Sequence, residues 1–169
     1  TLTSVDGKNS YCLIVDRATR YMWVHLSNTK VPPIEPVQMV LRKFGTQHAH
    51  RTVRTDQDRS LGKSVDFKRM VKDEGFTLEL TGTDSSQQNS PAERPHRDLA
   101  QMMRCALHSS ELGQEYWSFA LAHSVYVKNR LYHSALQTTP FQAFTGRRPD
   151  LSKLRIFGSR VYARETGNR

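Results

Sequence analysis

Cysteine is scarce in this sequence, and long apolar runs are absent. The 169 residues contain two cysteines, Cys12 and Cys105, without a Cys-x-x-Cys motif or a paired Cys/His spacing. This pattern excludes the common structural zinc modules and gives no sign of an oxidising compartment. No apolar stretch approaches the roughly 20 residues that span a bilayer, so we expect no membrane partner. Residues 1–6 also lack the basic and apolar regions of a secretory signal.

Acidic residues are outnumbered by basic ones. The chain has 16 Asp and Glu against 25 Lys and Arg, which gives a formal net charge of +9 and a pI of about 9.9. A domain this basic attracts polyanions, nucleic acid first and anionic membrane surfaces second. Ribosomal and chromatin proteins share this property, so the charge indicates the partner and leaves the chemistry open. The hydrophobic fraction of 37% is ordinary for a globular domain.

The pattern of apolar residues predicts an α/β layer fold. Two β-prone runs, residues 11–15 and 21–26, predict an antiparallel hairpin. The further predicted elements are helix 35–44, strand 52–55, helix 64–74, strand 76–80, a polar loop over 81–90, a helix from Pro91 capped by Ser90, helix 115–131, a helix start at Thr139-Pro140 and a β-prone stretch over 154–162. This order predicts a mixed sheet, antiparallel at first and then parallel, covered by helices.

The helix over 115–131 is rich in apolar side chains. We expect it to bury Trp117, Phe119, Ala120, Leu121, Val125 and Val127. Trp117 and its neighbour Tyr116 are therefore interpreted as core or interface residues and not as residues that stack on bases.

Two carboxylates lie where a metal site could form. Asp56 follows a predicted strand, and Glu93 falls in the first turn of the helix after the polar loop. A strand end and a helix start can bring two carboxylates onto one Mg²⁺, which prefers oxygen ligands. Two such ions about 4 Å apart activate the attacking hydroxyl and stabilise the leaving oxygen of a phosphodiester. Each residue also has an ordinary alternative, because Asp often forms turns after strands and Glu at a helix start favours the helix dipole.

Several segments of the chain match one known family in order. Thr55-Asp56-Gln57 and Gln87-Gln88-Asn89-Ser90-Pro91-Ala92-Glu93-Arg94 resemble a strand ending in Arg-Ser/Thr-Asp and a loop ending in Gln-Asn-Gly-x-Ala-Glu-Arg. The other matches are Ile14-Val15-Asp16-Arg17-Ala18-Thr19-Arg20-Tyr21, Asn129-Arg130 with Thr139-Pro140-Phe141, and Ile156-Phe157-Gly158. Together they resemble the integrase catalytic core of copia-type (Pseudoviridae-like) long-terminal-repeat retrotransposons, within the RNase H-like superfamily.

The resemblance implies a fold, a site and a reaction. The implied fold is RNase H-like, a mixed central β-sheet flanked by helices, in a fragment that lacks the start of the first strand. Asp56 and Glu93 would be two of three catalytic, metal-binding carboxylates that hold two Mg²⁺ (or Mn²⁺) ions. The implied reaction is polynucleotidyl transfer in DNA integration: 3′-end processing of element DNA and its strand transfer into target DNA. The core would cover residues 1–145, truncated at its N-terminus, with a C-terminal extension over 146–169.

The chain also departs from the family pattern. The family's first aspartate precedes a Gly-Pro pair and would lie several residues before Thr1, so we expect the fragment to be inactive alone. Asp6 lies in the loop that enters the hairpin, too late for this ligand, and Asp16 matches a hairpin-turn position. Asp58-Arg59-Ser60 replaces a Gly-Gly-Glu-like run, and Ser90 replaces a glycine, which removes backbone freedom. These changes suggest a decayed genomic copy.

Contacts to DNA are the next expectation. Arg97 lies one helical turn after Glu93, and a guanidinium group binds two phosphate oxygens at once. The predicted DNA-binding residues are Arg97, Arg94, Asn89 and Lys63. Each assignment has an ordinary alternative to DNA contact. Arg97 could form a surface ion pair with Glu93, which adds little stability. A solvated helix face would equally explain Lys63, Lys68, Arg69 and Lys72.

The partners and rival functions follow from the same resemblance. We expect element ends and target DNA as partners, a homo-oligomer in the intact enzyme and no small-molecule substrate. The expected location is the nucleus of a eukaryotic host at integration and a cytoplasmic particle before it. One alternative is a decayed or co-opted, non-enzymatic DNA-binding domain. Another is an RNase H-like nuclease, which the Gln-Asn-x-x-Ala-Glu-Arg loop disfavours because the fold alone does not determine the reaction.

Overall fold

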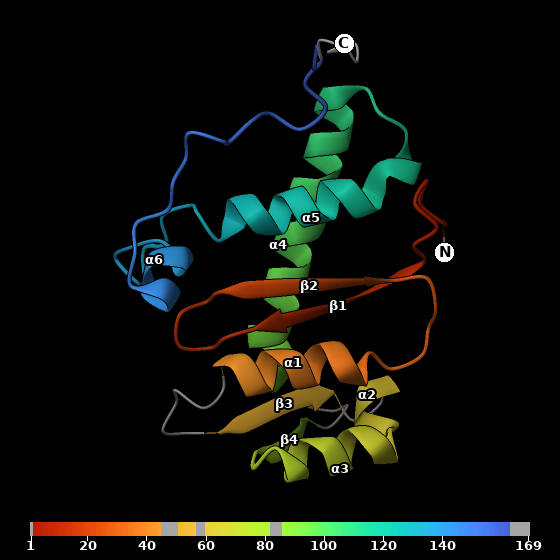
Figure 1. Ribbon diagram of the computed structural model, residues 1–169, viewed down its shortest axis with the longest axis vertical. Coiled ribbons are helices and arrows are strands. Elements are labelled where there is room, and N and C mark those ends of the chain that lie inside the picture. The colour runs from red at the N-terminus through yellow and green to blue at the C-terminus, as the bar shows by residue number, and fades with distance from the viewer. Residues whose placement is uncertain (1, 45–50, 57–59, 82–85, 163–169) are drawn as a thin grey trace, which may run out of the picture.

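Two small β-sheets and the helices around them make up the fold. The computed structural model describes residues 2–44, 51–56, 60–81 and 86–162 (Figure 1). The elements are β1 (Ser10–Val15), β2 (Met22–Ser27), α1 (Ile34–Phe44), β3 (Thr52–Asp56), α2 (Ser60–Lys63), α3 (Val65–Asp73), β4 (Thr77–Thr81), α4 (Ser86–Ser110), the 3₁₀ helix η2 (Gln114–Tyr116), α5 (Trp117–Lys128) and α6 (Pro140–Thr145). The predicted α/β class is confirmed. Within the described ranges, no helix is both long and apolar enough to cross a membrane.

The predicted antiparallel hairpin is confirmed as β1 and β2, with Val15 opposite Met22 at its closed end. The carboxylate of Asp16 accepts hydrogen bonds from the backbone N–H and the hydroxyl of Thr19. The N–H of Arg20, whose φ of 60° is left-handed, donates to the carbonyl of Asp16 at 2.8 Å. Asp16 is therefore a hairpin-turn residue, as predicted.

A parallel pair, β3 and β4, follows the hairpin and α1. The connection between its strands contains α3, as the sequence predicted, because parallel neighbours need a crossover. The hydroxyl of Ser64 caps the start of α3 by accepting a hydrogen bond from the N–H of Phe67 at 3.2 Å. After the helix, Gly75 adopts a left-handed conformation with a φ of 76°. The short helix α2, directly before α3, was not predicted.

The strand β1 separates two hydrophobic cores. Cys12 and Ile14 pack with β3, β4 and a buried cluster from α1 and α3, made of Val37, Leu41, Phe67, Met70 and Val71. Leu13 and Val15 pack on the other side against a second cluster, made of Met22, Leu99, Leu121 and Val125. Successive side chains of a strand point to opposite faces, so β1 joins α1 and α3 on one side to α4 and α5 on the other (Figure 1).

The described strands do not form the single mixed sheet that the sequence predicted. β1 pairs with β2 and β3 pairs with β4, as two separate two-stranded sheets. Ile14 of β1 and Val53 of β3 pack against the same cluster. Side-chain burial therefore holds the two pairs together, although no backbone ladder joins them in the described residues.

The helix that contains Glu93 begins earlier than predicted. α4 starts at Ser86 and not at Pro91, so the prediction that Ser90 is its cap was wrong. The predicted loop over 81–90 is correspondingly shorter, and its residues 82–85 lie outside the described residues. Polar composition alone suggested a loop, but residues 86–90 contain no glycine or proline, and glutamine is a good helix former.

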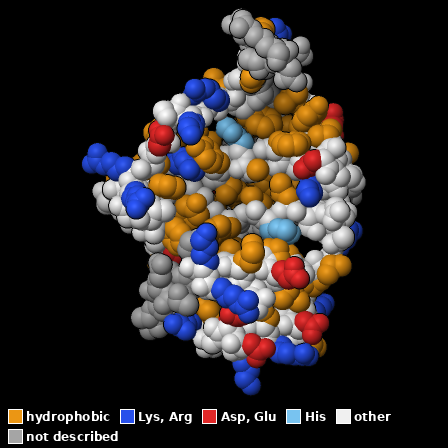
Figure 2. Space-filling view, viewed as in Figure 1, with side chains coloured by type: hydrophobic (Ala, Val, Ile, Leu, Met, Phe, Trp, Pro, Cys, Tyr) orange, Lys and Arg blue, Asp and Glu red, His pale blue; other side chains and the backbone are white. Residues whose placement is uncertain are grey.

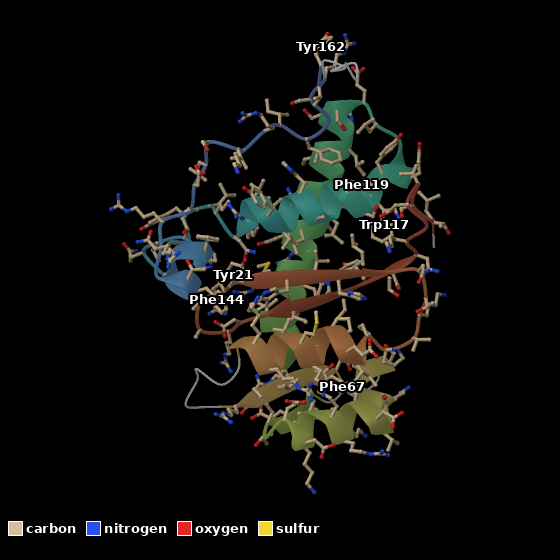
Figure 3. All side chains as sticks on the ribbon, viewed as in Figure 1. Tyr21, Phe67, Trp117, Phe119, Phe144 and Tyr162 are labelled. Atoms are coloured by element: carbon tan, nitrogen blue, oxygen red, sulfur yellow. The ribbon has the colours of Figure 1, made fainter. Side chains whose placement is uncertain are left out.

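The predicted helix over 115–131 is present as η2 and α5, and its buried face is only partly the expected one. Ala120, Leu121 and Val125 are buried, whereas Phe119 is 48% exposed, so its predicted burial was wrong (Figure 3). The buried positions beside them are Ser118 and Ser124. The serine hydroxyls find acceptors there, Ser124 in the carbonyl of Ala120 at 2.7 Å.

The last β-prone stretch, residues 154–162, forms no strand in the described part of the chain. Ile156, Val161 and Tyr162 are at least 78% exposed. Gly158 takes a φ of 75°, which interrupts an extended conformation. A strand needs a partner edge, and β-propensity without such an edge does not produce one. By contrast, the helix start at Thr139-Pro140 is confirmed, because Thr139 caps α6.

Candidate metal and DNA site

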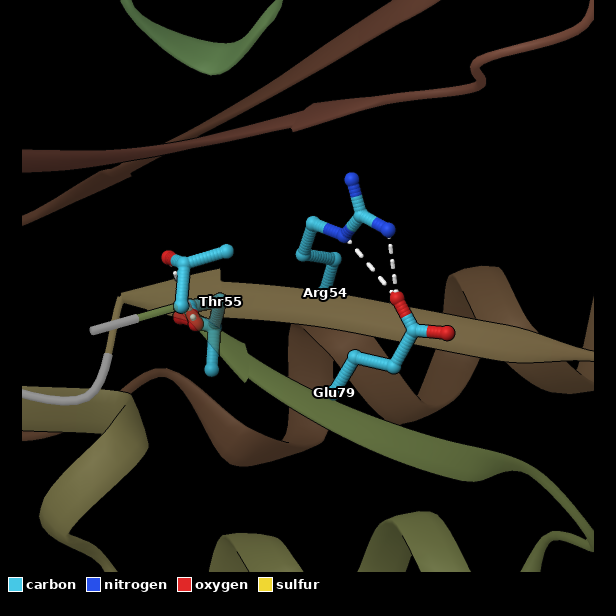
Figure 4. A network of polar contacts seen from close by, with 4 residues as sticks. Arg54, Thr55 and Glu79 are labelled. Carbon is cyan, nitrogen blue, oxygen red and sulfur yellow. Dashed lines mark hydrogen bonds and ion pairs between the residues drawn. The ribbon is translucent and has the colours of Figure 1, made fainter. Parts of the chain in front are cut away.

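Asp56 lies at the end of a strand, as the strand predicted over 52–55 implies. It is the last residue of β3, half-buried, and lies opposite Thr81 of β4 in the parallel register. The hydroxyl of Thr81 donates to the carbonyl of Thr55 at 3.4 Å, beside the aspartate (Figure 4). The short helix α2 packs against β3 near this point. The backbone around Asp56 is thus held by β4 and α2.

An ion pair links β3 and β4 two residues before Asp56. The guanidinium of Arg54 donates from Nε and Nη2 to Oε2 of Glu79, at 3.0 and 2.6 Å (Figure 4). Both side chains are nearly half exposed, so the pair adds little to stability. It does direct the Arg54 charge to Glu79 on the neighbouring strand.

Glu93 belongs to α4, the helix that follows β4. Its side chain lies outside the described residues, and so does that of Asn89. The described residues contain no group of three His, Cys, Asp or Glu side chains arranged to hold a metal ion. The convergence of Asp56 and Glu93 on a metal therefore stays a prediction.

The donor chemistry at Asp56 fits a hard divalent cation. A half-buried carboxylate at a strand end supplies the oxygen atoms that Mg²⁺ and Mn²⁺ prefer. The two thiols do not belong to this position, because Cys12 lies in β1 and Cys105 in α4. Burial raises the pKa of the Cys12 thiol to about 11, which opposes the thiolate that a softer metal would need.

Three of the predicted DNA-binding residues are exposed. Arg94 and Arg97 lie on α4, and Lys63 is the last residue of α2, the helix that packs near the end of β3. An exposed position suits contact with phosphate, but it equally suits an ordinary solvated surface. Their role in DNA binding stays a prediction.

α4 contacts the hairpin at His96. The hydroxyl of Tyr11 lies 3.2 Å from Nδ1 of His96, and their ring centroids are 5.7 Å apart. The ring of Tyr11 also lies 6.3 Å from that of Trp117. The contact with Tyr11 joins α4 to β1 three residues after Glu93 and gives His96 a structural role.

Trp117 is half-buried beside the second hydrophobic cluster, as the interpretation of it as a core residue requires. Its indole N–H donates to the carbonyl of Leu2 at 3.0 Å (Figure 3 shows its position on α5). The predicted solvated face of α3 is also confirmed, because Lys68, Arg69 and Lys72 are exposed.

Asp6 joins the N-terminal segment to α5. Its carboxylate accepts hydrogen bonds from the hydroxyl of Ser118, at 2.6 Å, and from that of Ser4. These hydrogen bonds hold the pKa of Asp6 below its usual value of 3.8, and the bond from Ser118 has the largest effect. The environment supports the view that Asp6 is a structural residue.

We expect Asp6→Asn to lower stability at pH 6 and to matter less at acidic pH. The folded-state pKa is below the unfolded one, so the contribution of Asp6 is present above about pH 3.8 and is lost as the pH falls through the folded-state value. The urea midpoint of both proteins, measured at pH 6 and pH 3, tests this. The exposed Asp73→Asn serves as control, and an equal difference between wild type and Asp6→Asn at both pH values would contradict it.

One buried structural contact was missed in the sequence analysis. Asn129 is 3% exposed, and its amide forms two hydrogen bonds of 2.9 Å with the backbone N–H and carbonyl of Met22. It thereby satisfies both backbone polar groups of the first residue of β2. In the sequence, Asn129 was noted only because Asn129-Arg130 matches a segment of the family, and that match predicted no contact for it.

Comparison with known proteins finds relatives among plant retroelements. The chain is 25% identical over 162 residues to the retrovirus-related Pol polyprotein from transposon RE2 of Arabidopsis thaliana, and 26% identical to that from transposon RE1. It is 26% identical over 173 residues to the Pol polyprotein from transposon TNT 1-94 of Nicotiana tabacum. These matches cover at least 95% of this chain but only 11–12% of each relative. No protein-family model matches the sequence. Nearly the whole chain is thus similar to one segment of retroelement polyproteins.

Proposed function

We propose that this chain is part of the catalytic core of a copia-type retrotransposon integrase, which joins DNA strands with the help of metal ions. The observation that carries the proposal is Asp56 at the end of β3, followed after β4 by α4, the helix that contains Glu93. The similarity to retroelement Pol polyproteins along the chain supports the same origin.

The arrangement of elements supports an RNase H-like architecture. An antiparallel hairpin comes first, then a parallel pair with its crossover helix, then two long packed helices. That order agrees with the family's mixed sheet flanked by helices, although the described strands pair two by two.

In this proposal Asp56 and Glu93 hold Mg²⁺ or Mn²⁺, two ions in the intact enzyme, with a third carboxylate from upstream. The ions would supply charge stabilisation at the attacking and leaving oxygens of the phosphodiester. Arg94, Arg97 and Lys63 would bind phosphates and hold the DNA in position, and positioning contributes much of the rate in such reactions. No covalent enzyme intermediate is needed.

DNA joining by the complete open reading frame that contains this chain tests the proposal. The expected result is transfer of a labelled 3′-hydroxyl end into a second duplex in Mg²⁺ or Mn²⁺, and no product in EDTA. The reading frame upstream of Thr1 is determined first, because an aspartate followed by Gly-Pro there supplies the third ligand. The 169-residue chain alone is expected to join nothing. Joining in EDTA, or none from a reading frame with all three carboxylates, would contradict the proposal.

The exposed arginines of α4 are also compatible with a second candidate, a decayed or co-opted domain that binds DNA without reacting with it. It predicts salt-sensitive binding that is the same with and without divalent metal. If the upstream sequence has a stop codon or a substituted aspartate, DNA binding is the function that remains. An RNA–DNA hybrid offered in the same assay distinguishes both candidates from an RNase H-like nuclease, which would cut the hybrid.

Two further proposals concern the setting of the intact enzyme. It would act as a homo-oligomer on paired DNA ends. It would reach the nucleus of a eukaryotic host from a cytoplasmic particle.

A further inference from the structure

Two segments far apart in the sequence meet at one end of the fold. The rings of Tyr21, at the end of the β1–β2 turn, and Phe144 of α6 stack with centroids 4.7 Å apart and an interplanar angle of 24° (Figure 3). Trp23 meets Phe144 edge-on at 5.1 Å. Stacked and edge-on ring contacts are specific in geometry, so they hold the turn and α6 in a fixed relation.

Arg130, in the turn that follows α5, strengthens this junction. Its guanidinium lies 3.5 Å from the ring centre of Tyr126 and 4.8 Å from that of Phe141. It also donates to the carbonyl of Tyr126 at 3.0 Å. Arg130 is therefore used internally, where it links the end of α5 to α6.

Four other arginines extend from the two segments that the junction holds together. Arg17 and Arg20 lie in the turn, and Arg147 and Arg148 follow Gly146, which caps the end of α6 with a φ of 72°. We call these four residues the arginine surface. Arg20 is half-buried and the other three are exposed. In Figure 2, Lys and Arg side chains gather at the left margin of the molecule, over α6 and the segment after it.

Basic side chains outnumber the carboxylates near the arginine surface in the part of the chain that the structure describes. Within the described residues, none of the four side chains forms an ion pair. Two carboxylates lie close in sequence, and each has a local hydrogen bond: Asp16 accepts from Thr19, and Asp150 accepts the backbone N–H of Ser152 at 2.9 Å. Positive charge therefore exceeds negative charge at this end.

We infer that the arginine surface binds the phosphate backbone of duplex DNA, as a second contact apart from the candidate metal site. Guanidinium groups present a planar fork that matches phosphate oxygens, and each neutralised phosphate releases counterions. The surface lies on the α6 side of the fold, whereas β3 ends with Asp56 on the opposite side, near α2 (Figure 1). A duplex held here would extend beyond the site of reaction. The choice of DNA as the polyanion rests on the proposed function.

Arg147→Ala/Arg148→Ala in the 169-residue chain tests the inference. Binding to a labelled 30-bp duplex is measured by fluorescence anisotropy in EDTA over a series of salt concentrations. We expect the slope of log affinity against log salt to become shallower by about 2, because each phosphate contact contributes close to 1. Arg17→Ala should change the slope by about 1. The control Lys68→Ala/Lys72→Ala removes the same charge from exposed positions on α3 and should leave the slope nearly unchanged.

Each other outcome would overturn the inference. An unchanged slope in the Arg147/Arg148 variant, an equal change in the Lys68/Lys72 control or the absence of DNA binding by the wild type would do so. Circular dichroism melting checks that the variants fold, and the single Arg17→Ala variant serves if the double variant does not. DNA joining in Mg²⁺ is measured separately, with the complete reading frame. The inference about the arginine surface can therefore fail while the proposed function stands, and the proposed function can fail while the arginine surface still binds DNA.

Discussion

Replacing Glu93 by glutamine is expected to abolish DNA joining and to leave the fold intact. Glutamine has the shape of glutamate but no charge, and hard divalent cations bind carboxylate oxygens far better than amide oxygens. The rate should fall on the order of 100-fold or more, because losing even an outer partner of a metal ligand costs roughly 10- to 100-fold. The measurement is the rate of joined product from the complete reading frame in Mn²⁺, together with thermal melting.

A matched control separates the loss of a ligand from the loss of a charge. Glu35 is an exposed glutamate in the first turn of α1, outside the candidate site. Glu35→Gln removes the same charge and should join DNA like the wild type. If Glu93→Gln kept its activity while its melting curve was unchanged, Glu93 would not be a metal ligand and the assignment of the site would fall.

The second large effect concerns stability, where we expect Asn129→Ala to cost about 2–4 kcal/mol of unfolding free energy. Asn129 is 3% exposed, and its amide satisfies both backbone groups of Met22 at 2.9 Å each. Alanine would leave a buried N–H and a buried carbonyl without partners, and each such group carries a desolvation penalty. Most domains of this size are stable by only about 5–15 kcal/mol, so the loss is a large fraction.

Urea denaturation followed by fluorescence measures this cost. Asn28 lies directly after β2 and is exposed, so Asn28→Ala controls for the removal of an asparagine amide from the same hairpin. Its effect should stay within about 0.5 kcal/mol. Equal midpoints for wild type and Asn129→Ala would show that water replaces the lost hydrogen bonds.

The candidate site shows where sequence reasoning was sufficient and where it was not. Asp56 was predicted at a strand end, and the structure has it there, because the β-branched residues before it favour an extended conformation. Glu93 was predicted in a helix and is in one, but the start at Pro91 was wrong. Helix starts are weakly encoded when a polar stretch suits both a loop and a helix.

Local physics let the sequence alone determine the hairpin, the helix starts at Ser64 and Thr139 and the strand that leads into Asp56. Turn chemistry, capping hydroxyls and alternation act within a few residues, so they can be read without the fold.

Only the tertiary structure decided which surfaces meet. α5 is apolar around much of its circumference, so its sequence does not select a buried face. Packing against α4 and β2 buries Ser118 and leaves Phe119 exposed. The same packing brings Asn129 to the edge of Met22 and α6 to the β1–β2 turn. These contacts join residues over 100 positions apart, and their free energy depends on burial and hydrogen bonding that exist only once the helices and strands have packed.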